Sequence, residues 1–371
     1  MEKTQERRRA GEGRGERAGI MADGAMTKRE ERAFARRVWG VGEREWGDWR
    51  WQLANRVWTA EGVRRAVGDL SEREQKGLRA REKWRMPLCL TPYGLSLVAR
   101  EPPDGAVRRM LLPDAREGRK RKDEWADSLG EEAHAVAPGL VRAYPHKALL
   151  LATADCACAC RYCTRARTSG AFGRAPGGWE AAVEWLRGCP DIHDVLVSGG
   201  DPLTMDDGRL DALLGALKGV PHVDFVRIGT KTPASLPQRA TRGLVRVLRK
   251  WRPVWLSTHF SHPAELTERA EEACRRLADA GIPLMNQCPL LRGVNDGNGV
   301  LEALCERLLR VGVKPYYLHS ADRVSGTGHF RVAKARGLEI VSAMHGRTTG
   351  YAVPLFMEDA PGGGRKRPVK G

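Results

Sequence analysis

The stretch ALLLATADCACACRYC (residues 148–163) joins an apolar run typical of a buried β-strand to a loop that contains four cysteines. Similar apolar runs begin at VLVSGG (195), FVRIGT (225), VWLSTHF (254), LMNQCPL (284) and KPYYLH (314), so successive runs start 47, 30, 29, 30 and 30 residues apart. Stretches with helical periodicity, such as 263–280 and 298–311, lie between them. A strand–helix unit repeated about six times at this spacing predicts an α/β fold with a parallel sheet, either a partial barrel or a doubly wound sheet.

Polar residues fall where these strands are expected to end. The cysteines follow the first run, Gly199-Gly200-Asp201 follows the second, His259 ends the fourth, and His319 to Asp322 follow the sixth. Both candidate architectures build their sites from loops at the carboxyl ends of the strands. We therefore expect these residues to form one site.

The cysteine loop has the spacing C-x-x-x-C-x-x-C at Cys156, Cys160 and Cys163. Three thiolates can hold three irons of a [4Fe–4S] cluster and leave the fourth iron open to a small molecule. The alternatives are a zinc site with Cys158 as fourth ligand, or a redox pair of Cys160 and Cys163. Because the sequence has no second C-x-x-C and no paired histidines downstream, the cluster is favoured.

The composition is that of a globular protein outside the membrane. The 371 residues are 42% hydrophobic, enough for a sizeable core, and no stretch approaches the roughly 18 apolar residues of a membrane helix. The N-terminus lacks the apolar centre of a secretory signal, and nine partly clustered cysteines do not fit a disulfide framework. These features predict a cytoplasmic protein with no membrane partner.

The formal net charge of +17 raises the question of nucleic-acid binding. The densest basic runs, 119–122 and 365–367, lack the interleaved aromatic residues of a base-stacking surface. We therefore expect solvated charge and sites for anionic cofactors, with no nucleic-acid partner. A basic RNA-binding or zinc protein is the alternative. Residues 1–37 are rich in Glu, Arg and Gly and are expected to be disordered.

Many short strings, in order, resemble the lysine 2,3-aminomutase family of radical S-adenosylmethionine enzymes. They extend from about Trp46 to the last residues: WGDWRWQL, TPYGLSL, CRYCTRAR, SGGDPL, RIGTKTP, LPQR, THFSHPAELT, NQCPLLRGVND, KPYYLH, GHFR, TTGYAVP and DAPGGGRK. The resemblance implies a partial (β/α)6 barrel over 138–345, preceded by an α-helical N-terminal region and connector (38–137). Residues 346–371 are then a C-terminal arm that carries a pyridoxal phosphate lysine.

The resemblance also implies roles for individual residues. The open iron of the cluster at Cys156, Cys160 and Cys163 binds S-adenosylmethionine, beside Ser198, Gly199, Gly200 and Asp201, with a further contact from His259. Lys366 carries pyridoxal 5′-phosphate, which Gln287, Tyr144 and Lys147 contact, whereas Ala143 replaces a residue that is usually basic in the family. Arg165 binds the substrate carboxylate, and Asp322 and Asp359 bind its distant ammonium.

The implied reaction converts L-lysine to L-β-lysine. Alternatives within the family are the short relative that makes β-lysine for elongation factor P, or a 2,3-aminomutase for another cationic amino acid such as arginine. A reductant protein such as flavodoxin or ferredoxin is the implied partner. Because this sequence lacks the zinc-binding cysteines of longer family members, we expect a homodimer. Without the resemblance, the sequence around Lys366 indicates an ordinary basic tail. Asp322 or Asp359, taken alone, would be interpreted as a surface residue.

Overall fold

One open, curled sheet organises the chain. The computed structural model describes residues 25–80, 87–119, 121–168, 178–360 and 365–371. Ten strands are hydrogen-bonded in chain order. They are β1 (Ala135–Ala137), β2 (Leu140–Tyr144), β3 (Lys147–Thr153), β4 (Asp194–Gly199), β5 (Phe225–Thr230), β6 (Val254–Thr258), β7 (Leu284–Leu290), β8 (Val313–Ser320), β9 (Leu355–Glu358) and β10 (Arg367–Pro368). Strands β3 to β9 are parallel, whereas β1, β2 and β10 add antiparallel pairs at the two edges.

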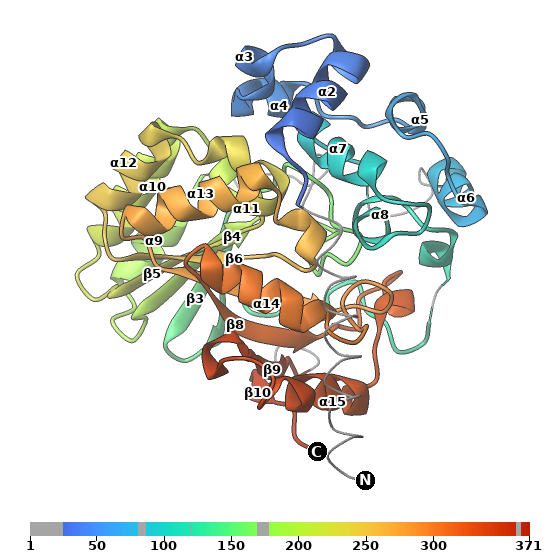
Figure 1. Cartoon of the computed structure of the whole chain (residues 1–371). Coiled ribbons are helices and arrows are strands. Elements are labelled where there is room, and N and C mark those ends of the chain that lie inside the picture. Colours follow the sequence, from blue (N-terminus) through green and yellow to red (C-terminus); the bar gives the residue numbers. More distant parts are fainter. Residues whose placement is uncertain (1–24, 81–86, 120, 169–177, 361–364) are drawn as a thin grey trace.

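Helices follow the strands and lie on the outer side of the sheet (Figure 1). They are α9 (Glu180–Arg187), α10 (Asp207–Lys218), α11 (Thr232–Ser235), α12 (Arg242–Lys250), α13 (Glu268–Asp279), α14 (Val300–Arg310) and α15 (Lys334–Met344). Three of them begin at a side chain that accepts from a backbone N–H of the first turn, namely Asp206, Thr241 and Thr267. The parallel strands follow one another in chain order without the reversal of a doubly wound sheet, and the sheet is not closed. The predicted partial (β/α)6 barrel is therefore confirmed, and the doubly wound alternative is not.

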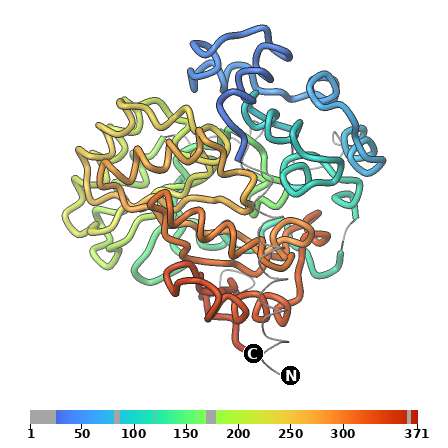
Figure 2. Tube along the Cα trace, viewed as in Figure 1, coloured from blue at the N-terminus to red at the C-terminus, as the bar shows by residue number. Residues whose placement is uncertain are grey.

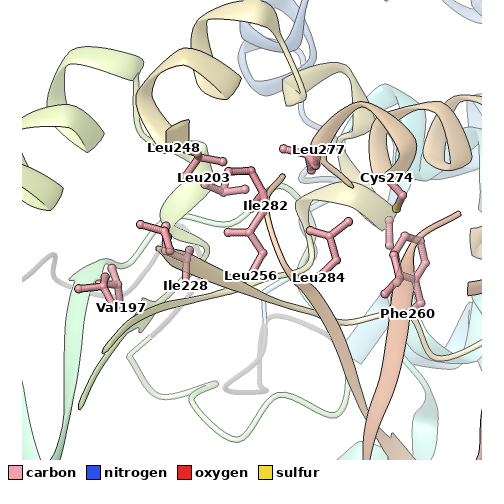
Figure 3. Close-up of a cluster of buried hydrophobic side chains, with 14 of the residues drawn as sticks. Val197, Leu203, Ile228, Leu248, Leu256, Phe260, Cys274, Leu277, Ile282 and Leu284 are labelled. Carbon is pink, nitrogen blue, oxygen red and sulfur yellow. The ribbon is translucent and has the colours of Figure 1, made fainter. Parts of the chain in front are cut away.

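The two faces of the sheet differ in burial. In β7 the buried residues Leu284, Asn286, Cys288 and Leu290 alternate with half-buried Met285, Gln287 and Pro289. Figure 3 shows the outer-face core, where Leu256 and Leu284, paired in the sheet, lie among helix side chains such as Leu277. Because residues i and i+2 share a face, the other set points to the concave side. Polar side chains placed there can serve a site without disturbing the core.

An α-helical region precedes the sheet, as expected, and lies beside the strand–helix repeat (Figure 2). Its helices are α2 (Lys28–Trp39), α3 (Glu43–Trp46), α4 (Trp49–Ala54), α5 (Ala60–Ala66), α6 (Glu72–Ala80), α7 (Pro92–Arg100) and α8 (Ala106–Leu111). They enclose a second core around fully buried Trp46 and Tyr93. Within the described ranges, no helix is both long and apolar enough to cross a membrane.

The prediction of disorder for residues 1–37 is wrong for its last part. Helix α2 starts at a capping box formed by Thr27 and Glu30, and it buries Phe34. Glu31 forms an ion pair with Arg269 of α13 at 2.6 Å, which attaches the helix to the barrel. Composition did not reveal this helix, because it contains few large apolar residues among many charged ones. Residues 1–24 lie outside the described residues.

Candidate active site

The cysteine loop follows β3 and is held by the N-terminal region. The backbone N–H of Ala159 donates to Cys89 O at 2.9 Å, and that of Arg161 donates to Met110 O at 2.8 Å. The buried guanidinium of Arg161 pairs with Glu117. Removing Arg161 would leave the buried carboxylate of Glu117 without this partner, which is costly. The helical N-terminal region therefore fixes the conformation of this loop.

Three of the four cysteines in the loop are partly exposed, and the fourth belongs to a core. Cys156, Cys160 and Cys163 interact electrostatically with one another, and burial raises the pKa of each thiol, that of Cys160 to about 12. Cys158 is buried, and its Sγ lies 3.6 Å from Thr91 Oγ1. A Cβ added at Gly94 of α7 would lie 2.6 Å from the same sulfur. Cys158 is therefore packed under α7.

The loop supplies the kind of ligand that an iron–sulfur cluster needs. Cys156, Cys160 and Cys163 are free thiols of one loop. A [4Fe–4S] cluster is held by cysteine thiolates, and three of them leave one iron open. In the part of the chain that the structure describes, no group of three His, Cys, Asp or Glu side chains that could hold a single metal ion is found.

The glycines after β4 let two loops pack closely. Gly199 has φ +111°, and a Cβ there would lie 2.2 Å from Thr153 O. A Cβ on Gly200 would lie 2.2 Å from Asp155 O, and the Gly200 N–H donates to Thr153 O at 2.6 Å. Only glycine fits such an approach. The loop 198–201 is therefore fixed against the start of the cysteine loop.

Asp201 is hydrogen-bonded within the protein. It is buried and accepts hydrogen bonds from Thr230 Oγ1 at 2.7 Å, from the backbone N of Lys231 at 2.7 Å and from that of Leu203 at 3.1 Å. Both carboxylate oxygens are thus engaged by the protein. This side chain holds the end of β5 beside the cysteine loop.

Lys366 lies on the concave side of the sheet, close to an aspartate and a histidine. Its Nζ is 3.6 Å from Asp359 Oδ2, 3.5 Å from His319 Nε2 and 5.2 Å from the ring centroid of Tyr317. Its backbone N–H donates to the hydroxyl of Tyr144 at 3.1 Å. The pairing of β10 with β9 explains this position, since Lys366 directly precedes β10 and Asp359 directly follows β9. The glycine-rich segment before it (361–364) lies outside the described residues.

Burial and charge shift the pKa values of this group. Burial lowers the pKa of Lys366, against the opposing effect of Asp359 and Asp322. Burial, followed by the negative charge of Asp359, raises the pKa of Asp322 to about 7. The structure therefore brings the two predicted substrate aspartates together, and an alkylammonium, that of Lys366, already interacts with both.

Arg165 connects this group to the cysteine loop. Its Nε donates to Glu131 at 2.8 Å and its Nη1 donates to Ser198 Oγ at 3.4 Å. Arg165 also interacts electrostatically with Asp322. Arg165 thus contacts Ser198 of the glycine loop and interacts with Asp322, which in turn interacts with Lys366.

The remaining predicted residues are His259, Gln287 and Lys147. His259 Nε2 lies 3.2 Å from Gln287 Nε2, and burial lowers the pKa of His259 to about 3, so its imidazole is neutral. Lys147 Nζ lies 5.1 Å from the ring centroid of Tyr144, on the β2–β3 hairpin. His259 and Gln287 thus lie beside each other, whereas Lys147 is exposed at the amino end of β3 and lies over the ring of Tyr144, whose hydroxyl bonds the backbone of Lys366.

Sequence reasoning missed several charged residues in this region. Glu131, which pairs with Arg165, lies in a connector read as irregular. Arg227 interacts electrostatically with Lys366, and its half-buried position on β5 alternates with buried Val226 and Ile228. Lys231 forms a buried ion pair with Glu265 beside the cysteine loop. The alternation in β5 was the only sequence signal for Arg227, and none indicated Glu131.

Comparison with known proteins gives close relatives. No family model matches the chain. It is 43% identical to the L-lysine 2,3-aminomutase of Clostridium subterminale over 331 residues, which cover 89% of this chain and 79% of the relative. It is 34% identical to the glutamate 2,3-aminomutase of Clostridioides difficile over 356 residues, 95% of this chain and 82% of the relative. The solved structure of SuiB from Streptococcus suis bound to S-adenosylmethionine aligns with a TM-score of 0.45 and 13% identity, over 59% of this chain and 51% of that chain.

Proposed function

This chain belongs to the lysine 2,3-aminomutase family, and from that premise we propose that it moves the α-amino group of L-lysine from carbon 2 to carbon 3. The observation that carries the choice of substrate is the interaction of Lys366 with Asp359 and Asp322. The side chain of a lysine substrate ends in the same alkylammonium. Two carboxylates stabilise such a cation and repel the carboxylate at the end of a glutamate side chain.

The residues present fit the cofactors of the family. Cys156, Cys160 and Cys163 would hold a [4Fe–4S] cluster, and Lys366 would carry pyridoxal 5′-phosphate. When bound, the cluster with S-adenosylmethionine supplies the initiating radical, and pyridoxal phosphate supplies the carbon that carries the migrating nitrogen. We propose that Arg227, whose Nε also pairs with Asp194 at 2.8 Å, contributes to binding the phosphate, because it interacts electrostatically with Lys366 and position 143 carries alanine.

The protein's own residues orient the substrate at both ends. Arg165, held by Glu131 and next to Ser198, would bind the substrate carboxylate through its guanidinium. Asp322 and Asp359 would bind the distant ammonium. Fixing both ends keeps carbons 2 and 3 in one place during the migration. His259 is neutral at this site, so it can contact a cationic sulfonium cofactor without repelling it.

An anaerobic assay with reductant, S-adenosylmethionine and pyridoxal phosphate tests this function. Lysine, arginine and glutamate are supplied in parallel, and the β-isomers are separated by chromatography. We expect β-lysine as the main product. Conversion of glutamate in preference to lysine would contradict the proposal. Conversion of arginine alone would mean that the substrate is a cationic amino acid other than lysine. A flavodoxin or ferredoxin replaces the chemical reductant in a second series.

Asp322 gives a pH-dependent prediction for substrate binding. Because its pKa is raised to about 7, this carboxyl loses its charge as the pH falls through 7, and kcat/KM for lysine should fall with it. Replacing Asp322 by Asn should raise the KM for lysine about 10- to 100-fold, the loss expected for one charged hydrogen bond, and should remove this limb of the pH profile. The matched control is Asp224→Asn, because Asp224 is an exposed aspartate that directly precedes β5. A variant that retains the wild-type KM and pH profile would disprove the role of Asp322.

A further inference from the structure

His319 lies against Lys366, and the reaction described above gives it no role. Its Nε2 is 3.5 Å from Lys366 Nζ, and its Nδ1 is 3.9 Å from Asp359 Oδ2. Among the described residues, the buried Nδ1 has no hydrogen-bond partner. Lys366 Nζ is in turn 3.6 Å from Asp359. The amine of Lys366, the imidazole of His319 and the carboxylate of Asp359 therefore lie close to one another.

The position of His319 is fixed by the sheet. It lies near the carboxyl end of β8, where it pairs with Pro289 of β7 on one side and Met357 of β9 on the other. The ring of Tyr317 packs against the imidazole at a centroid distance of 5.5 Å. Because the backbone of His319 is paired with a strand on each side, its imidazole is held in place beside Lys366.

Burial keeps the imidazole of His319 neutral, so that one ring nitrogen has a free lone pair. Burial, followed by the positive charge of Lys366 and by His259, lowers the pKa of His319 well below its usual range. A neutral imidazole has one N–H and one lone pair. If Nδ1 carries the hydrogen toward the carboxylate of Asp359, the lone pair of Nε2 faces Lys366 Nζ. Lys366 is faced in addition by Asp322, Arg227 and the hydroxyl-bearing rings of Tyr144 and Tyr317.

We propose that His319 accepts the proton that Lys366 must lose before its amine can act as a nucleophile. This inference rests on the proposed role of Lys366 as the pyridoxal phosphate lysine. The N–H bond at Nζ breaks, its electron pair stays on Nζ as the lone pair, and a new N–H bond forms at Nε2. The positive charge passes from the ammonium to the imidazole and stays beside Asp359. No charge leaves the buried group, so the desolvation cost of the transfer is small.

The rate of cofactor attachment to the protein tests this proposal without the radical reaction. The full chain, freed of cofactor, is mixed with pyridoxal phosphate, and the absorbance of the C=N linkage is followed in time from pH 6 to 10. His319→Gln keeps a hydrogen-bonding group but cannot carry the proton, and His319→Asn is the second variant. The matched control is His222→Gln, because His222 lies just before β5 and its Nε2 forms a hydrogen bond with Leu186 O.

We expect His319→Gln to slow the attachment at pH 7 by roughly 10²-fold or more, the usual contribution of a general base. The final extent should equal that of the wild type, the difference should shrink at high pH, and added imidazole should restore part of the rate. An unchanged rate and pH profile, or a reduced final extent at an unchanged rate, would overturn the proposal. If the wild type itself forms no linkage at Lys366, the proposed role of Lys366 fails, and this inference with it.

Discussion

Replacing Lys366 by Ala is expected to abolish β-lysine formation, with a loss on the order of 10⁴-fold or more, as for removal of a covalent catalytic group. The physical reason is the position of its amine. The Nζ lies 3.6 Å from Asp359 and 3.5 Å from His319 on the concave side of the sheet, and no other lysine among the described residues forms an ion pair or hydrogen bond with either side chain. The measurements are product formation and pyridoxal phosphate absorbance after gel filtration. Reduction with borohydride, followed by mass spectrometry of the peptides, should locate the cofactor on Lys366 in the wild type.

Lys370→Ala separates this role from the basic character of the tail. Lys370 is exposed and lies four residues after Lys366 in the same short segment. We expect this variant to retain the cofactor and the activity. If Lys366→Ala retained both, or if Lys370→Ala lost both, the C-terminal segment would be an ordinary basic tail and the attachment site would lie elsewhere.

The fold could be predicted from the sequence because its signal is repetitive. Apolar runs such as 195–200 and 225–230 recur near every thirty residues, and each is a strand of the observed sheet. The edges of the sheet carry no such signal. Strand β10 consists of Arg367 and Pro368 only, and it exists because it pairs with Glu358 and Met357 of β9. Helix α2 was missed because its apolar face is narrow, and its docking depends on the Arg269 ion pair.

The site could be predicted only in part from composition and spacing. The loop cysteines stand out in the sequence, but Cys158 differs from Cys156, Cys160 and Cys163 in being buried under α7, which spacing does not reveal. The family resemblance places Asp201 beside the cofactor, and nothing in the sequence indicated its hydrogen bonds to Thr230 and Lys231 at the end of β5. His319 and Glu131 depend on contacts between segments far apart in the chain. Such long-range pairs leave no periodic pattern in a single sequence.

The two neighbouring cysteines Cys160 and Cys158 provide the sharpest test of the metal centre. Cys160→Ala should remove one of three cluster ligands, so iron and sulfide should fall to background after anaerobic reconstitution, and cleavage of S-adenosylmethionine should be lost. Cys158→Ala should keep iron, sulfide and cleavage, because that sulfur contacts Thr91 and lies against Gly94 in the N-terminal core. Its only expected cost is a small loss of stability, read as a lower Tm. Equal loss of iron from both variants would mean that Cys158 is a ligand, and zinc bound in place of iron and sulfide would leave the proposed reaction without its source of radicals.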